Sequence, residues 1–226
     1  MGLFVQEKSI AAPGEGLAEG MDYLPGPYTR RVGERIVAQR LGLVNIEGRA
    51  IKLIPLSGCY LPKFGDTIIA KVYDITLNGW LVETNSAYRA MLNIKDTMRF
   101  IRKGEDLTQY FDVGDYIKAK IVNVTSQNLV DVTMKEPGMT KLTGGRVIKV
   151  NPSKVPRVIG KQGSMISLIK EKTGSNIVVC QNGVVWIQSE NLGNELRAIR
   201  AIQKIESEAH IEGLTERMAE FLARGV

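Results

Sequence analysis

The pattern of apolar and polar positions at the start of the chain is typical of short strands and turns. Between residues 34 and 56, two strand-like runs, RIVAQRLGLVNI and RAIKLIPL, flank a turn signal at Glu47-Gly48. The first 28 or so residues are rich in glycine and proline, which favours an extended arm over a helix or a core strand. We therefore expect a small β-rich module at residues 1–62.

Five further strand-like runs follow in the middle of the chain. They cover residues 67–73, 79–84, 90–94, 116–124 and 129–134, and turn signals such as Leu77-Asn78-Gly79 separate them. Five short strands with one long connection, here residues 95–115, are typical of a closed OB-type barrel. We place this barrel at residues 63–136.

After Pro137-Gly138 the pattern alternates between strands and helices. In the order βααββα, we predict a strand at 146–150, helices at 155–159 and 164–173, strands at 176–180 and 184–188, and a helix at about 194–209. Gln181-Asn182-Gly183 is a hairpin turn signal. Apolar positions from Leu214 to Leu222 predict one more helix. The fold class is therefore multidomain and mainly β, with an α+β domain and a C-terminal helical extension at residues 137–226.

Composition limits the class of protein and its compartment. With 44% hydrophobic and 24% charged residues, the chain carries no mark of disorder, and no apolar run approaches the roughly 18 residues of a membrane span. The opening residues lack a signal peptide, and Gln6 stands where a myristoylation motif needs Ser or Thr. We expect a cytoplasmic protein without a membrane anchor.

Residues with catalytic or metal-binding chemistry are sparse. Cys59 and Cys180 lie far apart in the sequence, which favours two buried free thiols over a disulfide or a metal site. His210 is the single histidine, and we expect it to be solvated or packed. No GxSxG, HExxH or phosphate-loop motif occurs, so we expect no catalytic residue, no metal and no cofactor. A nuclease whose carboxylates meet only on folding is the alternative.

The placement of charge matters more than the net charge of +6. Residues 61–136 carry ten basic and ten acidic groups, whereas residues 141–172 contain only one acidic group, Glu171. The basic residues of this second segment are Lys141, Arg146, Lys149, Lys154, Arg157, Lys161, Lys170 and Lys172. Such clustering is typical of a nucleic-acid-binding surface.

A glycine-containing turn lies inside this basic segment. Gly160-Lys161-Gln162-Gly163 joins two predicted helices and resembles the GXXG loop of KH domains, which in type I have the order βααββα. Two glycines let the backbone approach a phosphate, the helix from Ser164 offers free N–H groups, and Arg157 and Lys161 add positive charge. We predict RNA contact here, flanked by Lys149, Lys154 and Lys172. The alternative is an ordinary helix–helix turn; an ATP-binding loop is excluded by Val155 and Gln162.

The barrel segment resembles S1 domains through Gly79-Trp80-Leu81-Val82 and residues 111–115. The family positions that stack bases are occupied by Asn78, Leu81, Asn93 and Leu129, so we do not expect base stacking on this face. Contacts to the RNA backbone are expected instead from exposed basic side chains, against the alternative of a solvated surface: Arg89, Lys95, Arg99, Arg102 and Lys103. We predict that Trp80 is a packing residue.

The order of the modules resembles the S1/KH-type RNA-binding cap subunits of the archaeal RNA exosome. The resemblance covers nearly the whole chain and includes LPGPYTR at residues 24–30 and IPLSGCYLPKFGD at residues 54–66. It implies that three copies, alone or mixed with another cap subunit, dock through their N-terminal modules on a hexameric ring of RNase PH-like subunits. The S1 barrels would frame an entry pore, and the chain would feed single-stranded RNA to phosphorolytic sites in the ring without cutting it.

A second interpretation is a transcription elongation or termination factor that joins S1 and KH modules and binds nascent RNA. It shares the order of an S1 domain before a KH domain. The single GXXG loop in this chain counts against it, because that family carries paired KH modules.

Overall fold

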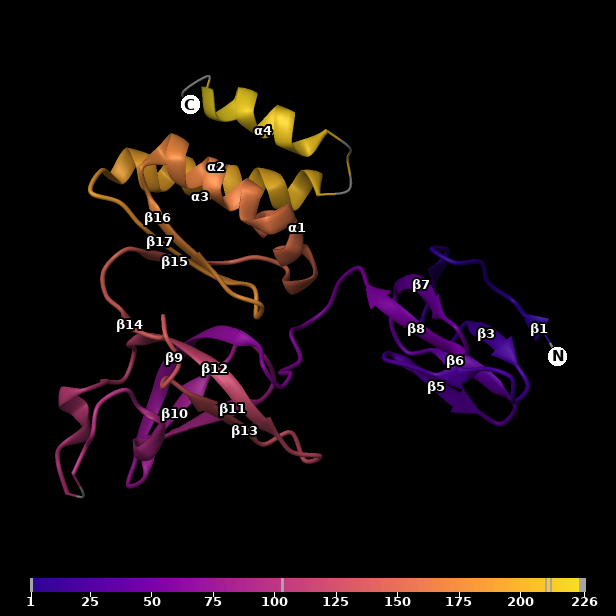
Figure 1. Ribbon diagram of the computed structural model, residues 1–226, viewed down its shortest axis with the longest axis horizontal. Helices are drawn as coiled ribbons and strands as arrows, with labels where there is room; N and C mark the ends of the chain where they lie inside the picture. Colours follow the sequence, from indigo (N-terminus) through magenta and orange to yellow (C-terminus); the bar gives the residue numbers. More distant parts are fainter. Residues whose placement is uncertain (1, 103, 210, 212, 224–226) are drawn as a thin grey trace. The chain divides into compact units, whose positions relative to one another are not determined.

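The structure is a computed structural model that describes residues 2–102, 104–209, 211 and 213–223, and these residues form a mainly β protein with four α-helices (Figure 1). The chain divides into two compact units, Met1–Gly58 and Cys59–Val226. The second unit contains both the barrel and the α+β part, so the division into three domains at residues 62 and 136 stays a prediction. No helix within the described residues is long and apolar enough to cross a membrane.

The first unit consists of two four-stranded sheets. One sheet has the order β1 (Gly2–Leu3), β3 (Gly16–Glu19), β6 (Arg35–Ala38), β5 (Thr29–Val32). The other has the order β2 (Ile10–Ala11), β7 (Gly42–Glu47), β8 (Ala50–Pro55), β4 (Leu24–Pro25). Both sheets contribute to one core, in which Leu17, Ile36 and Ile51 are fully buried. The predicted β-rich module is confirmed.

The prediction of an extended arm over the first 28 residues is wrong. This segment contains four short strands, and Leu17 and Ala18 of β3 belong to the core. The glycines and prolines mark the turns between strands that are too short to show a periodic pattern. Gly14 and Gly20, for example, flank β3 with φ values of 88° and 102°, which favour glycine.

The barrel consists of β9 (Thr67–Thr76), β10 (Gly79–Glu83), β11 (Arg89–Asn93), β12 (Tyr116–Val124) and β13 (Val130–Thr133). Each strand pairs with two others of the barrel, and the antiparallel β9–β12 and parallel β11–β13 pairings close the circle. Trp80 is fully buried in this core, its Nε1 donates to the carbonyl oxygen of Phe111 at 2.8 Å, and the two rings meet edge to face. The five-stranded S1/OB-like barrel and the packing role of Trp80 are therefore confirmed.

The α+β part has the order β15 (Arg146–Lys149), α1 (Val155–Ile159), α2 (Ser164–Thr173), β16 (Asn176–Val179), β17 (Val184–Gln188), α3 (Leu192–Glu208). The sheet order is β15-β17-β16 and all pairs are antiparallel, as in a type I KH domain. The helix α4 (Leu214–Ala223) packs against α2 and α3 through Met218 and Leu222. This confirms the predicted order and the extra helix.

The central strand β17 is apolar without alternation because both of its faces are buried. Val185 and Ile187 pack in the core under the helices, whereas Val184 and Trp186 pack with Ile69 of the barrel. The barrel and the KH sheet therefore share an apolar contact. Cys180 lies in the same cluster, and burial raises the pKa of its thiol to about 12.

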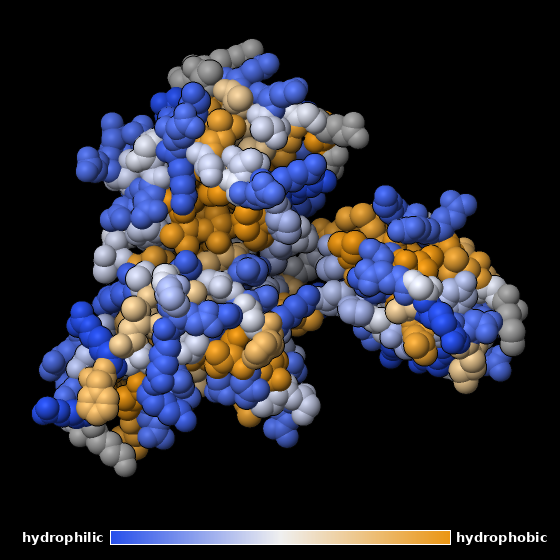
Figure 2. All heavy atoms as spheres, in the orientation of Figure 1, coloured by the Kyte–Doolittle hydropathy of each residue, from blue (hydrophilic) through white to orange (hydrophobic). Residues whose placement is uncertain are grey.

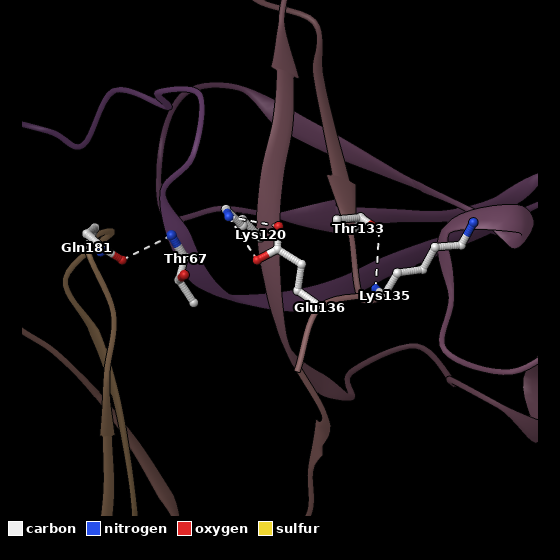
Figure 3. Close-up of polar contacts among 6 residues, drawn as sticks. All are labelled: Thr67, Lys120, Thr133, Lys135, Glu136 and Gln181. Carbon is white, nitrogen blue, oxygen red and sulfur yellow. Dashed lines mark hydrogen bonds and ion pairs between the residues drawn. The ribbon is translucent and has the colours of Figure 1, made fainter. Parts of the chain in front are cut away.

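The hairpin between β16 and β17 ties the KH domain to the barrel. Asn182 is fully buried, and its Nδ2 donates to the carbonyl oxygens of Ile69 at 2.8 Å and Thr84 at 3.0 Å. Gln181 accepts a hydrogen bond from the backbone N–H of Thr67 at 3.1 Å (Figure 3). The predicted hairpin turn is present, and its polar side chains bind barrel backbone in place of water.

Candidate nucleic-acid interface

The backbone of the loop between α1 and α2 needs its two glycines. Gly160 has φ 77° and ψ 176°, and a Cβ there would lie 2.7 Å from the Cβ and the backbone nitrogen of Met165. Gln162 and Gly163 follow in the left-handed region, with φ values of 52° and 82°. This succession of turns bends the chain sharply and presents the side chains of Lys161 and Gln162 to solvent.

The first turn of α2 can accept an anion. Gly163 is its N-cap residue and has no side chain, so no side chain caps the helix. The N-terminus of a helix carries unsatisfied N–H groups and partial positive charge, which together attract phosphate oxygens. Lys161 in the loop and Arg157 in the last turn of α1 add two exposed cations next to this site.

Two of the eight basic residues in the segment 141–172 have structural partners. Lys141 forms an ion pair with Asp115, and Arg146 lies 3.3 Å from the carboxylate of Glu195, which is nearly buried. The other six have no ion pair within 4.0 Å in the described part of the chain: Lys149, Lys154, Arg157, Lys161, Lys170 and Lys172. Most of the predicted positive surface therefore remains free for a ligand.

The predicted flanking residues do not all lie near the loop. Lys154 belongs to a 3-10 turn that leads directly into α1, and Lys149 ends β15 shortly before it. Lys172 lies in the last turn of α2, eight residues beyond Ser164 and thus about 12 Å further along the helix axis. Lys154, Arg157 and Lys161 therefore lie in the consecutive short elements that lead into α2, whereas Lys172 lies at the opposite end of α2.

The basic residues of the barrel differ in their surroundings. Arg89 stacks over the ring of Tyr73, with its guanidinium carbon 3.7 Å from the ring centroid. Lys95, Arg99 and Arg102 lie on the long connection between β11 and β12, are exposed, and have no ion pair within 4.0 Å among the described residues. Lys103 and His210, both considered from the sequence, lie outside the described residues.

The long connection also forms a cavity of about 1300 Å³ with the turn between β9 and β10. Asn78 and Asn93, two of the positions where S1 domains stack bases, line this cavity. Phe100 lies on the same cavity and is 89% exposed. Phe100 was not among the residues predicted from the sequence. The signal that could have identified it is its place between Arg99 and Arg102, an aromatic residue interleaved with basic ones.

No group of three or more His, Cys, Asp or Glu side chains among the described residues is arranged to hold a metal ion. Cys180 is buried as predicted, but Cys59 is exposed, so the prediction of two buried thiols is wrong for Cys59. Cys59 follows Gly58, in a segment without helix or strand between the two units, where no packed core covers its side chain.

Comparison with known proteins agrees with the fold and the loop. A sequence model of the KH domain matches residues 145–207. The chain is 43% identical to the exosome complex component Rrp4 of Pyrococcus furiosus over 97% of this chain and 84% of that protein. It is 41% identical to the component of the same name in Methanothermus fervidus, over 99% of both chains. A crystal structure assigned as an exosome complex RNA-binding protein superposes with a TM-score of 0.68 at 33% identity, covering 74% of this chain and 97% of that one.

The fold defines a protein in which an S1/OB-like barrel is joined to a type I KH domain behind a small β-rich unit. These two relatives match nearly the whole chain at 43% and 41% identity and bear one name. The chain therefore belongs to the archaeal family of the exosome complex component Rrp4. This membership favours the exosome interpretation of the sequence over that of an elongation or termination factor.

Proposed function

We propose that this protein is a non-catalytic, cytoplasmic RNA-binding cap subunit of the archaeal exosome. It docks on a hexameric ring of RNase PH-like subunits, in three copies, alone or together with a second kind of cap subunit. It recruits single-stranded RNA and threads it toward phosphorolytic sites that degrade it from the 3′ end. The observation that carries the RNA-binding part is the glycine-flanked loop at the uncapped start of α2, with Lys161 and Gln162 exposed.

The chemistry of this loop suits a phosphate of a nucleic-acid backbone. The N-terminus of α2 supplies N–H donors and a positive dipole end, and Lys154, Arg157 and Lys161 supply charge that no carboxylate in the described residues neutralises. Because these contacts are made to the phosphates of the RNA backbone, they position RNA without selecting its base sequence. An ordinary helix–helix turn would not need three unpaired cations beside two left-handed residues.

The outer face of one sheet in the first unit supports docking on a protein partner. Ile10, Leu43 and Ile54 lie directly opposite one another on β2, β7 and β8. Ile10 is 63% and Ile54 is 48% exposed, although their neighbours Ala11 and Leu53 are buried. Figure 2 shows apolar surface gathered over β7. An exposed apolar patch of this kind marks a protein interface.

A polar rim completes the docking surface. Asn45 and Lys52 form the next outward pair on β7 and β8, and Lys52 forms an ion pair with Glu47. An apolar centre bordered by polar side chains is the usual anatomy of a protein–protein interface. We assign this surface, defined by Ile10, Leu43 and Ile54, to the ring of RNase PH-like subunits.

The docking assignment is tested by mixing purified chain with a purified archaeal RNase PH-like ring and measuring complex formation by native mass spectrometry. The double variant Ile10→Asp, Ile54→Asp is expected to lose binding to the RNase PH-like ring, because two carboxylates would be desolvated on binding. Val32→Asp is the control, since Val32 is 50% exposed on the other sheet. Undiminished assembly of the double variant would overturn the assignment.

The non-catalytic assignment is tested by incubating the chain alone with labelled RNA, phosphate and a divalent metal ion. We expect no product, because RNA cleavage is assigned to the ring. Sustained turnover that a point substitution in this chain abolishes would show that the protein is itself a nuclease.

A further inference from the structure

The strand β15 forms a free edge of the KH sheet. The sheet order is β15-β17-β16, and α1 and α2, which carry the KH loop, contact the opposite edge strand β16. The backbone N–H of Val150, just after β15, donates to the carbonyl oxygen of Gly183 at 2.8 Å. Because bonded residues alternate along an antiparallel ladder, the N–H and C=O groups of Val147 and Lys149 point away from β17. In the described part of the chain these groups have no hydrogen-bond partner.

The helix α3 runs beside β15 over the whole length of the strand. Arg146, at the start of β15, lies 3.3 Å from the carboxylate of Glu195. The backbone N–H of Asn151, just after the strand, donates to the carboxylate of Glu206 at 2.7 Å. The span from residue 146 to 151 in a strand and the span from 195 to 206 in a helix are both about 17 Å. These two contacts therefore hold one flank of α3 above the free edge of β15.

This flank of α3 is apolar and partly uncovered. Leu192, Leu196 and Ile199 follow one another at spacings of four and three residues, which places them on the same side of the helix. Leu192 is 57% and Leu196 is 40% exposed. The helix α4 covers a different flank, on which Arg197 donates to the carbonyl oxygen of Leu222 at 3.0 Å. Apolar side chains and unpaired backbone groups therefore lie together along one groove.

The free charges beside this groove are positive. Lys149 and Arg200 are exposed and have no ion pair within 4.0 Å among the described residues. The carboxylates of Glu195 and Glu206 are already engaged by the contacts that join α3 to the end residues of β15. A second copy of this chain would bring the same two cations to the groove, whereas an acidic ligand would complement them.

We propose that the free edge of β15 and the flank of α3 at Leu192, Leu196 and Ile199 bind an extended, acidic segment of another protein by strand addition. Main-chain hydrogen bonds to Val147 and Lys149 hold the segment, and every second side chain packs against the apolar flank of α3. Acidic side chains between them meet Lys149, which lies on the same face of the sheet as Val147.

The edge favours a peptide over RNA. It offers N–H and C=O groups in alternation at the spacing of a strand, which another strand matches and a nucleic-acid backbone, with acceptors only on its phosphates, does not. The site goes beyond the proposed function, because it requires neither RNA nor the RNase PH-like ring.

The test measures binding of the full-length chain to a fluorescein-labelled peptide of four Val-Glu repeats by fluorescence anisotropy. A peptide of four Val-Lys repeats has the same length and the opposite charge, and we expect it not to bind. Val147→Pro removes an outward N–H that the β15–β17 ladder does not use, so an edge strand tolerates it. Val147→Ala loses the same packing and keeps the N–H. We expect Val147→Pro to bind the acidic peptide about tenfold more weakly than Val147→Ala.

A surface substitution on α3 tests the apolar flank without touching the strand. Leu196→Glu puts a carboxylate against the acidic peptide and should weaken binding about tenfold. Ser167→Glu makes the same change of charge at an exposed position of α2 and should bind as the wild type does. Thermal unfolding of each variant verifies that it is folded, and Leu196→Glu decides the question if Val147→Pro does not fold.

RNA titrations of the same variants separate this site from the KH loop, because Val147→Pro and Leu196→Glu should bind RNA as the wild type does. No binding of the acidic peptide, or equal affinity in wild type and Leu196→Glu, would overturn the proposal and leave the proposed function standing. Loss of RNA affinity in Leu196→Glu, without peptide binding by the wild type, would assign the groove to nucleic acid. A dimer in analytical ultracentrifugation that Leu196→Glu dissociates would assign it to a second copy. Either result would overturn the proposal.

Discussion

Two glycine-containing turns of the KH domain have similar sequences and opposite environments. Gly160-Lys161-Gln162-Gly163 exposes its polar side chains and makes no hydrogen bond to another module among the described residues, whereas Gln181-Asn182-Gly183 is packed against the barrel. In both turns a polar residue precedes a glycine with φ near 80°. The local sequence thus specifies each turn, whereas the residues packed around it determine whether its hydrogen-bonding groups stabilise the fold or stay available to a ligand.

Substitution of the two glycines with φ near 80° should lower stability by clearly different amounts, and the loss at Gly183 should be the greatest of all. Gly183→Ala would place a methyl group against the carbonyl oxygen of Val150, whereas at Gly163 the nearest atom lies 3.9 Å away. We expect Gly163→Ala to lower the free energy of unfolding by about 1–2 kcal/mol from backbone strain alone. Gly183→Ala should lower it by about 4 kcal/mol, because overpacking adds to the strain. Equal losses in urea titrations would show that the hairpin is not tightly packed.

Removal of the buried amide is expected to have the next largest effect. Asn182→Ala would leave the carbonyl oxygens of Ile69 and Thr84 buried without these donors. The free energy of unfolding should fall by about 3 kcal/mol, as measured by chemical denaturation. Gln162→Ala is the matched control, because Gln162 is exposed and its loss should change stability by less than about 0.5 kcal/mol.

Substitutions in the exposed loop at residues 160–163 should lower RNA affinity without lowering stability. Lys161→Asp with Gln162→Asp puts two negative charges against the phosphate and retains both glycines, so RNA affinity should fall about tenfold, with stability unchanged. RNA titrations at several salt concentrations measure the affinity. Lys170→Asp with Gln203→Asp makes the same charge change on α2 and α3 away from the loop and should bind more tightly than the loop variant. Equal losses in the two double variants would exclude the loop as the main contact.

The smallest effect concerns the thiol next to the hairpin. Burial raises the pKa of Cys180 from 9.0 to about 12, and only the thiolate reacts with disulfide reagents. At pH 8.5 we expect Cys59 to react quickly and Cys180 only after unfolding, with Asn182→Ala accelerating the second reaction. The same shift contributes stability that is complete below pH 9 and is lost as pH rises toward 12, because the unfolded chain releases its proton first. Rapid reaction of both thiols in the native protein would contradict the burial.

The regular parts of the fold could be predicted from the sequence because their pattern is local. Turn signals and alternating runs located the barrel strands, and the change of period after Pro137 located the KH helices. The core strand at Leu17 could not be found, because a strand of four residues between glycines has no period. The helix α3 begins two residues earlier than predicted, since the side chain of Asn191 caps it by accepting from Gly193 at 2.8 Å.

The candidate site was predictable only in part. The GXXG motif and the clustered charge identified Arg157 and Lys161, because both signals lie in one short segment. The pairing of Arg146 with Glu195 and the stacking of Arg89 on Tyr73 depend on residues distant in sequence or on another strand. The exposure of Phe100 depends on Ile101, which packs in the barrel core. No local sequence pattern predicts this packing.

A phosphorolysis assay with an archaeal RNase PH-like ring, with and without this chain, measures whether the protein recruits RNA for the ring. We expect the chain to lower KM for a long single-stranded RNA and to leave kcat per ring unchanged. Lys161→Asp with Gln162→Asp should raise KM again while the complex stays assembled. An unchanged KM in an assembled complex would contradict the claim that this protein recruits RNA for the ring.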